Sequence, residues 1–299
     1  PTRRSSDLVS LSAIVYGVIP LITKTIYEFG FDAISISFFR FFLMIPILLV
    51  ICIIKNKSLK IGILGLLNIF LFIALPSGLT MLLLNESYNY ISIGTATTLH
   101  FLYPAFVILI CIFYYHQEIE RKILISLLMI MIGISCFMDR IDYKGIFGII
   151  LAFLSAITYA IYLVQLEQKK FYDLDPMVLS LYTSICISIT LGIIGFFSKS
   201  LLFESCNYDN RIPLYFIILS FFSMIAIVSL QIGTRYLGAK LTALFSLLEP
   251  ITSIVTGVVC LQEELHFLKI IGCLFILIAM LNIIFSKSKN KKKNSKMTM

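Results

Sequence analysis

Hydrophobic residues in this chain gather into long stretches separated by short polar gaps. A helix needs roughly 20 mostly apolar residues to cross the ~30 Å hydrocarbon core of a bilayer. Ten stretches have about that length, at residues 8–27, 33–54, 61–84, 91–114, 122–138, 145–166, 177–198, 213–234, 240–261 and 268–286. Hydrophobic residues form 59% of the sequence and charged residues 13%, unlike the balance of a soluble domain. The pattern predicts an all-α polytopic membrane protein with ten transmembrane helices.

Lys and Arg are distributed unevenly among the polar gaps. If both termini are cytoplasmic, 17 of the 24 basic residues lie on the cytoplasmic side and five on the outer side, while Lys24 and Arg40 fall within helices. Cytoplasmic loops of membrane proteins carry such an excess of positive charge. We therefore expect a protein of the cell membrane with cytoplasmic N and C termini. The net charge of +8 then reflects topology, and it does not indicate a nucleic-acid partner.

The second half of the sequence repeats features of the first half at a shift of 143 to 146 residues. The matches are residues 12–16 with 155–159, Asp32 with Asp175, Tyr90 with Tyr236, and Pro104 with Pro250. We predict one five-helix repeat at 1–140 and a second at 141–286, followed by a basic cytoplasmic tail at 287–299. Because five is odd, the second repeat enters the membrane from the opposite side. Inverted repeats of this kind are typical of secondary transporters, although a duplication can also build a channel or a scaffold.

The first apolar stretch contains an aromatic–glycine pair, Tyr16–Gly17, and the second contains a single arginine, Arg40. With these residues the first repeat resembles the EamA-type branch of the drug/metabolite transporter superfamily. Tyr16 and Gly17 are similar to the aromatic–glycine pair of that family's first helix, although Trp is common at the position of Tyr16. Arg40 is similar to the arginine of its second helix, and Thr183 stands where the second repeat would carry the counterpart of Arg40.

The resemblance extends to the fourth helix of each repeat. Residues 97–104 and 243–250 are similar to the family's two proline-bearing helices, and each is followed by a short acidic turn, at 117–118 and 263–264. The resemblance covers nearly the whole chain. It implies a ten-helix carrier of small metabolites, often an exporter, without specifying the metabolite.

Three charged residues lie within the apolar stretches and more than two positions from either end. A charge at the bilayer centre costs on the order of 3 kcal/mol, so each one needs a partner or a function. Glu249 lies about eight residues into its stretch, ~12 Å deep, and could bind a substrate amine or a coupling proton. Arg40 could hold a substrate carboxylate with its planar guanidinium. Structural roles are the alternatives, including an Arg40–Glu249 pair, and Lys24 near a helix end could extend its ammonium group to the interface.

Several uncharged polar residues join these candidates. His100 falls near the middle of its stretch, where it could relay protons or simply make a packing hydrogen bond. Tyr103 matches Glu249 across the repeats. The remaining candidates for substrate contact are Tyr16, Tyr159 and Gln231, and the candidate gating residues are Pro104 and Pro250.

The residues together predict a secondary transporter of amino acids or similar small metabolites that works by alternating access, with export as the expected direction. The expected partners are the lipid bilayer and a small-molecule substrate. Protons are a candidate coupling ion, and a homo-oligomer is left open. The sequence has no GxxxxGK phosphate loop, and His100, His116 and His266 lack HExxH spacing, so we expect no enzyme activity, cofactor or metal. A passive channel and a polytopic membrane enzyme are the alternatives.

Overall fold

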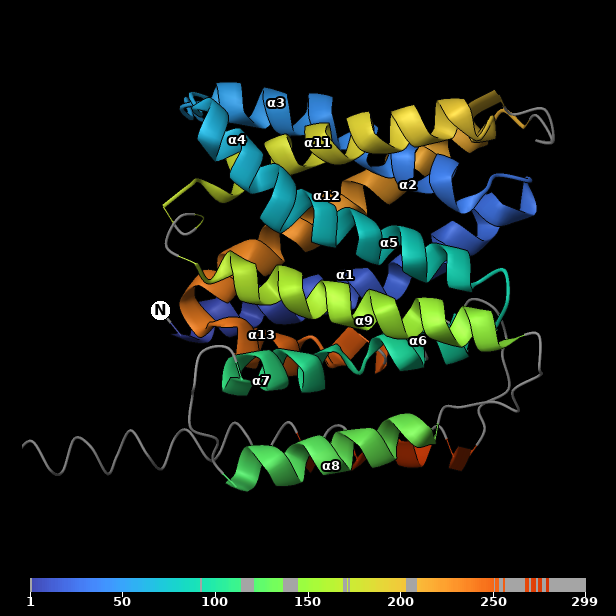
Figure 1. The fold of residues 1–299 in the computed structure, drawn as a ribbon, viewed down its shortest axis with the longest axis vertical. Coiled ribbons are helices and arrows are strands. Elements are labelled where there is room, and N and C mark those ends of the chain that lie inside the picture. Colours follow the sequence, from blue (N-terminus) through green and yellow to red (C-terminus); the bar gives the residue numbers. More distant parts are fainter. Residues whose placement is uncertain are drawn as a thin grey trace, which may run out of the picture.

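The computed structural model describes most of the chain as a bundle of helices. It describes residues 2–91, 93–113, 121–136, 145–168, 171, 173–202 and 209–249, with 251–252, 255, 267–268, 270–272, 274–275 and 278–279. All regular structure in these residues is helical. Figure 1 shows the helices lying side by side along roughly one direction, with α3 and α11 at one margin and α8 at the other. The predicted tail at 287–299 lies outside the described residues.

The second and third predicted spans are each built from more than one helical segment. The elements of the first repeat are α1 (Thr2–Glu28), α2 (Ala33–Phe42), α3 (Met44–Ile54), α4 (Ile63–Ile69), the π-helix η1 (Phe70–Ala74), α5 (Leu75–Ser87), α6 (Ile93–His100), α7 (Tyr103–Phe113) and α8 (Arg121–Ser135). Those of the second repeat are α9 (Ile146–Leu166), α11 (Pro176–Phe197), the 3₁₀ turn η3 (Ser200–Leu202), α12 (Ile212–Leu237) and α13 (Ala239–Phe245).

Six helical segments of the described residues are long and apolar enough to cross a membrane. They are Ser5–Glu28, Ala33–Ile54, Ile63–Ser87, Ile146–Leu166, Pro176–Phe197 and Ile212–Leu237. Each corresponds to a span predicted from the sequence, so the chain is a multi-pass membrane protein. The other four predicted spans are shorter or incompletely described, and the count of ten stays a prediction.

The predicted helix at 91–114 is interrupted in its middle. α6 ends at His100, Phe101 and Leu102 form a turn, and α7 begins at Tyr103. Pro104 has no backbone N–H to continue the helical ladder, and the backbone N of Leu102 instead bonds the carbonyl oxygen of Leu99 at 3.1 Å. The expectation of one continuous helix is therefore wrong here.

The predicted helix at 240–261 is interrupted at the matching place. α13 ends at Phe245, and Ser246 and Leu247 form a turn before Glu249. The two breaks lie about one repeat shift apart. Non-helical backbone within a membrane protein is tolerated where protein or a water-filled cavity surrounds it.

Local structure repeats between the two halves. Asp32 caps the start of α2 by accepting from the backbone N of Ser35 at 2.8 Å, and its match Asp175 caps α11 by accepting from Met177 N at 2.9 Å. Asn56 and Lys199, also 143 residues apart, both have positive φ, 49° and 61°. Residues that match across the sequence repeat therefore lie at equivalent helix starts and helix ends in the structure.

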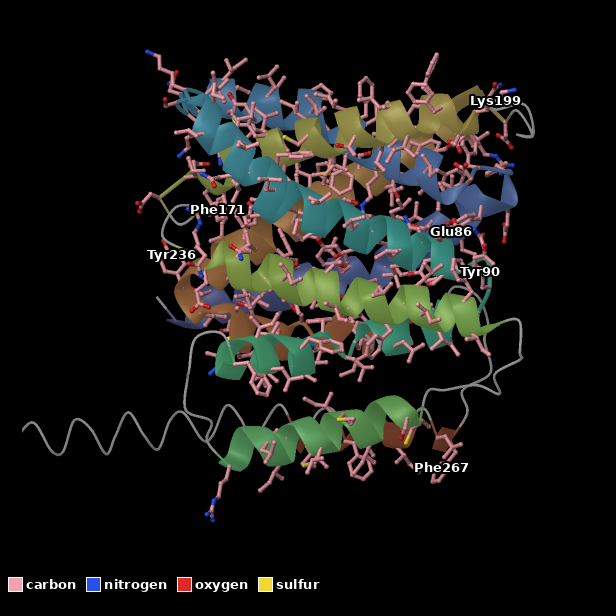
Figure 2. All side chains as sticks on the ribbon, in the orientation of Figure 1. Glu86, Tyr90, Phe171, Lys199, Tyr236 and Phe267 are labelled. Atoms are coloured by element: carbon pink, nitrogen blue, oxygen red, sulfur yellow. The ribbon has the colours of Figure 1, made fainter. Side chains whose placement is uncertain are left out.

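The two ends of the bundle can be told apart by labelled residues. Figure 2 shows Glu86, Tyr90 and Lys199 at one end, called here the Tyr90 end, and Phe171 and Tyr236 at the other, the Tyr236 end. Tyr90 and Tyr236 match each other across the repeats, yet they lie at opposite ends.

At the Tyr236 end, an ion pair joins the two repeats. Lys57 Nζ, after α3, lies 2.8 Å from Asp175 Oδ2, at the start of α11. Burial raises the pKa of Asp175, but the hydrogen bonds from Lys57 and Met177 outweigh it and hold the pKa below its ordinary value. A second ion pair, Arg211–Asp209, lies within one loop and likewise lowers the pKa of Asp209 through the hydrogen bond from Arg211.

Candidate functional site

A polar cavity lies between α1, α2, α5, α6, α9 and the segment after α13. Its volume is about 30 Å³, enough for about two water molecules. Nine of its thirteen lining residues are polar: Tyr16, Thr23, Arg40, Asn85, Tyr88, Thr97, His100, Tyr159 and Glu249. The cavity therefore gathers two charges of opposite sign and several hydrogen-bonding groups in an otherwise apolar bundle.

Arg40 lies in α2 and is only 2% exposed. Within the described part of the chain, its Nε and Nη2 atoms have no hydrogen-bond partner. Glu249, Tyr16 and Tyr88 are among the groups that act on it electrostatically. A buried guanidinium with free N–H groups is strongly unfavourable unless an anion or water binds it. Arg40 is thus suited to receive a carboxylate.

Glu249 is held against α1 through its backbone. Its carbonyl oxygen accepts from Thr252 Oγ1 at 2.8 Å. α1 comes close at Gly17, where an added Cβ would contact Thr252 and lie 2.8 Å from the Glu249 carbonyl oxygen. Glycine permits this approach because it has no side chain. The aromatic–glycine pair therefore sets the position of Glu249 beside Tyr16.

Arg40 and Glu249 line the same cavity but do not form an ion pair. Among the described residues, neither has an oppositely charged group within the 4.0 Å that defines an ion pair, although each acts on the other electrostatically. The predicted alternative, in which the two side chains satisfy each other, is not what this conformation shows. Both charges remain available to a ligand.

His100 is the last residue of α6 and is 4% exposed. Its Nδ1 lies 3.0 Å from Ser155 Oγ, and Ser155 Oγ donates to the carbonyl oxygen of Ala152 at 2.6 Å. Because that bond uses the one hydroxyl proton of Ser155, His100 donates from Nδ1. The neutral ring then has Nε2 as an acceptor.

Tyr103 and Tyr159 form an aromatic cluster with His100. Their ring centroids lie 4.7 Å apart at an interplanar angle of 87°, and the His100 ring lies 5.4 Å from Tyr103 and 5.2 Å from Tyr159. Tyr159 lines the cavity, whereas Tyr103 is fully buried behind His100. Edge-on aromatic pairs fix ring positions, so Tyr103 supports the site from behind.

A model of the EamA-like transporter family matches residues 7–138 and 146–285. The chain belongs to the EamA-like transporter family. The two matched segments confirm the resemblance and its two-repeat pattern, and they place the chain in a family of membrane transporters. No curated protein matches the chain. A solved structure titled "Crystal structure of protein" is 14% identical, covers 95% of this chain and 98% of its own, and has a TM-score of 0.77; this likeness concerns the fold alone.

The remaining predicted residues of this EamA-like transporter lie away from the cavity. Gln231 Oε1 accepts from Ser180 Oγ at 3.0 Å, and its Nε2 donates to Tyr162 Oη at 3.4 Å. The Tyr162 ring is stacked on Tyr159 at a centroid distance of 5.9 Å. Gln231 therefore reaches the cavity only through two tyrosines. Pro104 is buried in the first turn of α7, and Pro250 lies outside the described residues.

Sequence reasoning missed two residues of the cavity at the end of α5. Asn85 and Tyr88 line it near the Tyr90 end. Asn85 Nδ2 donates to Ser37 Oγ at 3.0 Å, and Tyr27 Oη donates to the Asn85 carbonyl oxygen at 2.9 Å. The available signal was an amide at the end of an apolar stretch, but such a residue is also usual at the membrane interface.

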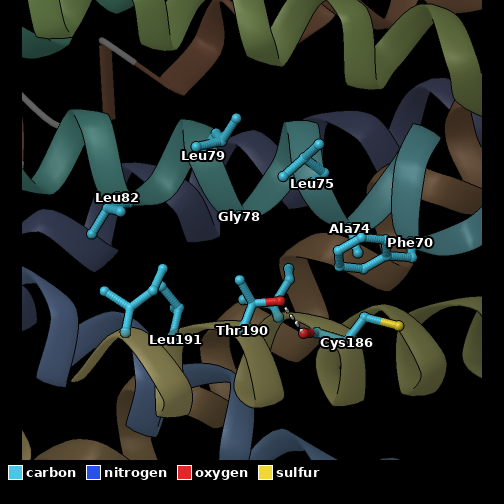
Figure 3. Close-up of a pocket in the computed structure, with 11 residues that line it drawn as sticks. Phe70, Ala74, Leu75, Gly78, Leu79, Leu82, Cys186, Thr190 and Leu191 are labelled. Carbon is cyan, nitrogen blue, oxygen red and sulfur yellow. Dashed lines mark hydrogen bonds between the residues drawn. The ribbon is translucent and has the colours of Figure 1, made fainter. Parts of the chain in front are cut away.

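A second hollow in this EamA-like transporter is apolar. It has a volume of about 50 Å³ and lies between the α4–η1–α5 segment and α11 (Figure 3). Its polar group, the Thr190 hydroxyl, donates to the Cys186 carbonyl oxygen of the same helix at 2.9 Å. It offers no charge to a polar metabolite, so the cavity at Arg40 and Glu249 is the better candidate. No group of three or more His, Cys, Asp or Glu residues in the described ranges could hold a metal.

Proposed function

We propose that this protein is a secondary transporter of amino acids or similar small zwitterionic metabolites, and that it works in export. The main observation that supports this proposal is that Arg40 and Glu249 line one cavity, have side chains of opposite charge type and do not form an ion pair. A zwitterion presents both complementary charges on one small molecule. Its binding would satisfy both groups at once.

In the proposed complex, the substrate carboxylate binds Arg40 and the ammonium group binds Glu249. A guanidinium donates two parallel hydrogen bonds to a carboxylate, and the Nε and Nη2 atoms of Arg40 are the two that lack partners. Tyr16 and Tyr159 flank the charges and can contact the ammonium group with their ring faces. The substrate side chain would face the apolar part of the lining, which consists of Ile19, Pro20, Met81 and Leu84.

Transport would follow from alternation between two conformations of inverted repeats. The opposite placement of Tyr90 and Tyr236 supports this inversion. Lys57 and Arg235 lie at the Tyr236 end, so the positive-inside rule favours that end as cytoplasmic. The cavity, lined by Asn85 and Tyr88, would then be approached from the outer side. Its volume of about 30 Å³ is too small for an amino acid, so binding requires movement of the surrounding helices.

Protons are the coupling ion that the site favours. Glu249 is a carboxyl group and His100 a neutral imidazole, and both line the cavity. Protonation of Glu249 would weaken its attraction for an ammonium group and release the substrate. One inward proton would then exchange for one exported substrate.

Counterflow in proteoliposomes tests this function. Vesicles containing wild type or Glu249→Gln are preloaded with single amino acids, and uptake of the labelled compound is measured with and without a pH gradient. We expect saturable exchange of one amino-acid class, strengthened by the gradient in wild type and lost in Glu249→Gln. Non-saturable flux would support a passive channel, and chemical conversion of the compound would support an enzyme.

A further inference from the structure

Glu167 and Lys24 occupy equivalent positions in the two repeats and carry opposite charges. The 143-residue shift that relates the first helices of the repeats places Lys24 onto Glu167. The 146-residue shift places Ile93, the first residue of α6, onto Ala239, the first residue of α13. The repeat therefore relates two contact positions: the end of α9 with the start of α13, and the end of α1 with the start of α6.

The contact between α9 and α13 is formed. Glu167 follows the last residue of α9, and its Oε2 accepts from the backbone N of Ala239 at 3.1 Å. Gly238 has a φ of 79°, which favours glycine, and an added Cβ there would lie 2.9 Å from Glu167 Oε1. The carboxylate therefore holds α13 against α9 at the Tyr236 end, one helix upstream of Glu249.

The equivalent contact between α1 and α6 cannot form in the same way. An ammonium group has no acceptor, so Lys24 cannot accept from a backbone N–H at the start of α6. The cavity lies between these helices: Pro20 and Thr23 of α1 line it, and so do Thr97 and His100 of α6. The two ends thus differ, because one is held by a carboxylate and the other borders the cavity.

We propose that Glu167 and Lys24 form an asymmetric gate that favours the conformation closed at the Tyr236 end. This inference rests on the proposed transport by alternating access. In the opposite conformation, the start of α13 leaves α9 and the start of α6 approaches α1. A contact that is present in only one conformation shifts the population toward that conformation. The Glu167 carboxylate supplies such a contact.

Cysteine labelling can measure both ends of this gate. Cys111 is buried in α7 within electrostatic range of Glu167 and Lys240, so it is a native reporter for the Tyr236 end. Met81 lines the cavity, so Met81→Cys reports on the Tyr90 end. A membrane-impermeant maleimide is added to either face of oriented proteoliposomes, and peptide mass spectrometry resolves the labelled cysteines.

Glu167→Lys should raise Cys111 labelling from the Tyr236 face roughly ten- to hundredfold, as expected for loss of a hydrogen bond to a charged group. Glu167→Gln keeps a carbonyl acceptor and should stay within severalfold of wild type. Lys24→Glu supplies the missing acceptor at the other end and should reduce labelling of Met81→Cys from the Tyr90 face. Unchanged labelling in either Glu167→Lys or Lys24→Glu would overturn the gate.

Two controls keep this result interpretable. Asp209→Asn removes an ion pair confined to one loop and should change neither reporter, so a change there would also count against a specific gate. If Glu167→Lys does not fold, the Lys24→Glu result decides alone. Labelling needs no substrate, so predicted labelling without amino-acid counterflow would retain the gate and reject the proposed substrate.

Discussion

Arg40 and Glu249 lie on opposite repeats, line one cavity and remain unpaired. Two groups of opposite charge that neutralised each other would form a structural tie between helices. Here the buried guanidinium of Arg40 keeps Nε and Nη2 without hydrogen-bond partners among the described residues, so its desolvation cost is uncompensated. This arrangement is poor for stability alone, and it makes sense if a ligand completes it.

Arg40→Met should abolish substrate exchange without destabilising the protein. Methionine of similar length removes a buried charge that lacks hydrogen-bond partners, and apolar replacement of such groups is often neutral or stabilising. The substrate loses hydrogen bonds to a charged group, which weakens binding by about ten- to hundredfold. Thermal unfolding in detergent and counterflow on the same preparation check both halves. A large loss of stability would show that Arg40 is a structural residue.

Gly17→Ala should displace Glu249 and destabilise the fold by about 1–3 kcal/mol, the usual cost of overpacking. The new methyl group would meet Thr252 and the Glu249 carbonyl oxygen. Gly62→Ala is the matched control, because nothing lies within 4 Å of a Cβ built there. Two quantities are measured for each variant, the melting temperature and the affinity for substrate. Equal behaviour of the two variants would contradict the close approach of α1.

Ser155→Ala should cost about 1–3 kcal/mol, because it leaves the buried Nδ1 of His100 without its partner. Ser223→Ala is a suitable control, since this buried serine donates to the carbonyl oxygen of Leu219 in its own helix. We also expect slower exchange in Ser155→Ala, because the His100 ring loses its orientation. The free energy of unfolding and the exchange rate are measured for both serine variants. Equal losses of stability and of exchange in the two variants would show that the His100 contact is unimportant.

The Lys57–Asp175 pair should make stability depend on acid pH. The pKa of Asp175 lies below its ordinary value of 3.8 in the folded protein. A depressed carboxyl pKa stabilises the fold above the unfolded value, and this stabilisation is lost as pH falls through the folded pKa. The difference in melting temperature between wild type and Asp175→Asn should therefore shrink below about pH 4. A difference that is constant from pH 7 to pH 3 would show that the ion pair contributes nothing.

Charged and polar residues within an apolar stretch are conspicuous in the sequence, which is why several predicted candidates are found together in the structure. Arg40, Glu249 and His100 all line the cavity, together with Tyr16 and Tyr159. The repeat shift also matched real structure, since Asp32 and Asp175 cap equivalent helices. These signals are local, so they can be recognised in the sequence without knowledge of which helices are in contact.

Other features depended on packing that hydropathy does not encode. Gln231 is as polar as Asn85, yet it faces Ser180 and Tyr162 while Asn85 faces the cavity. The turn at Phe101 precedes Pro104, which the sequence marks as a candidate gating residue, but hydropathy alone does not predict the interruption. Which face of a helix meets which neighbour is decided by the assembled bundle.

The most direct test of the central claim is the binding of substrate analogues that carry only one of the two charges. For the exchanged amino acid, the matching amine lacks the carboxylate and the matching carboxylic acid lacks the ammonium group. Binding of each analogue to purified wild type, Arg40→Gln and Glu249→Gln is measured as a shift in melting temperature, which requires no exchange activity. We expect Arg40→Gln to lose binding of the acid but keep binding of the amine, and Glu249→Gln to show the reverse. Equal loss of binding of both analogues in both variants would contradict the assignment of one charge to each residue.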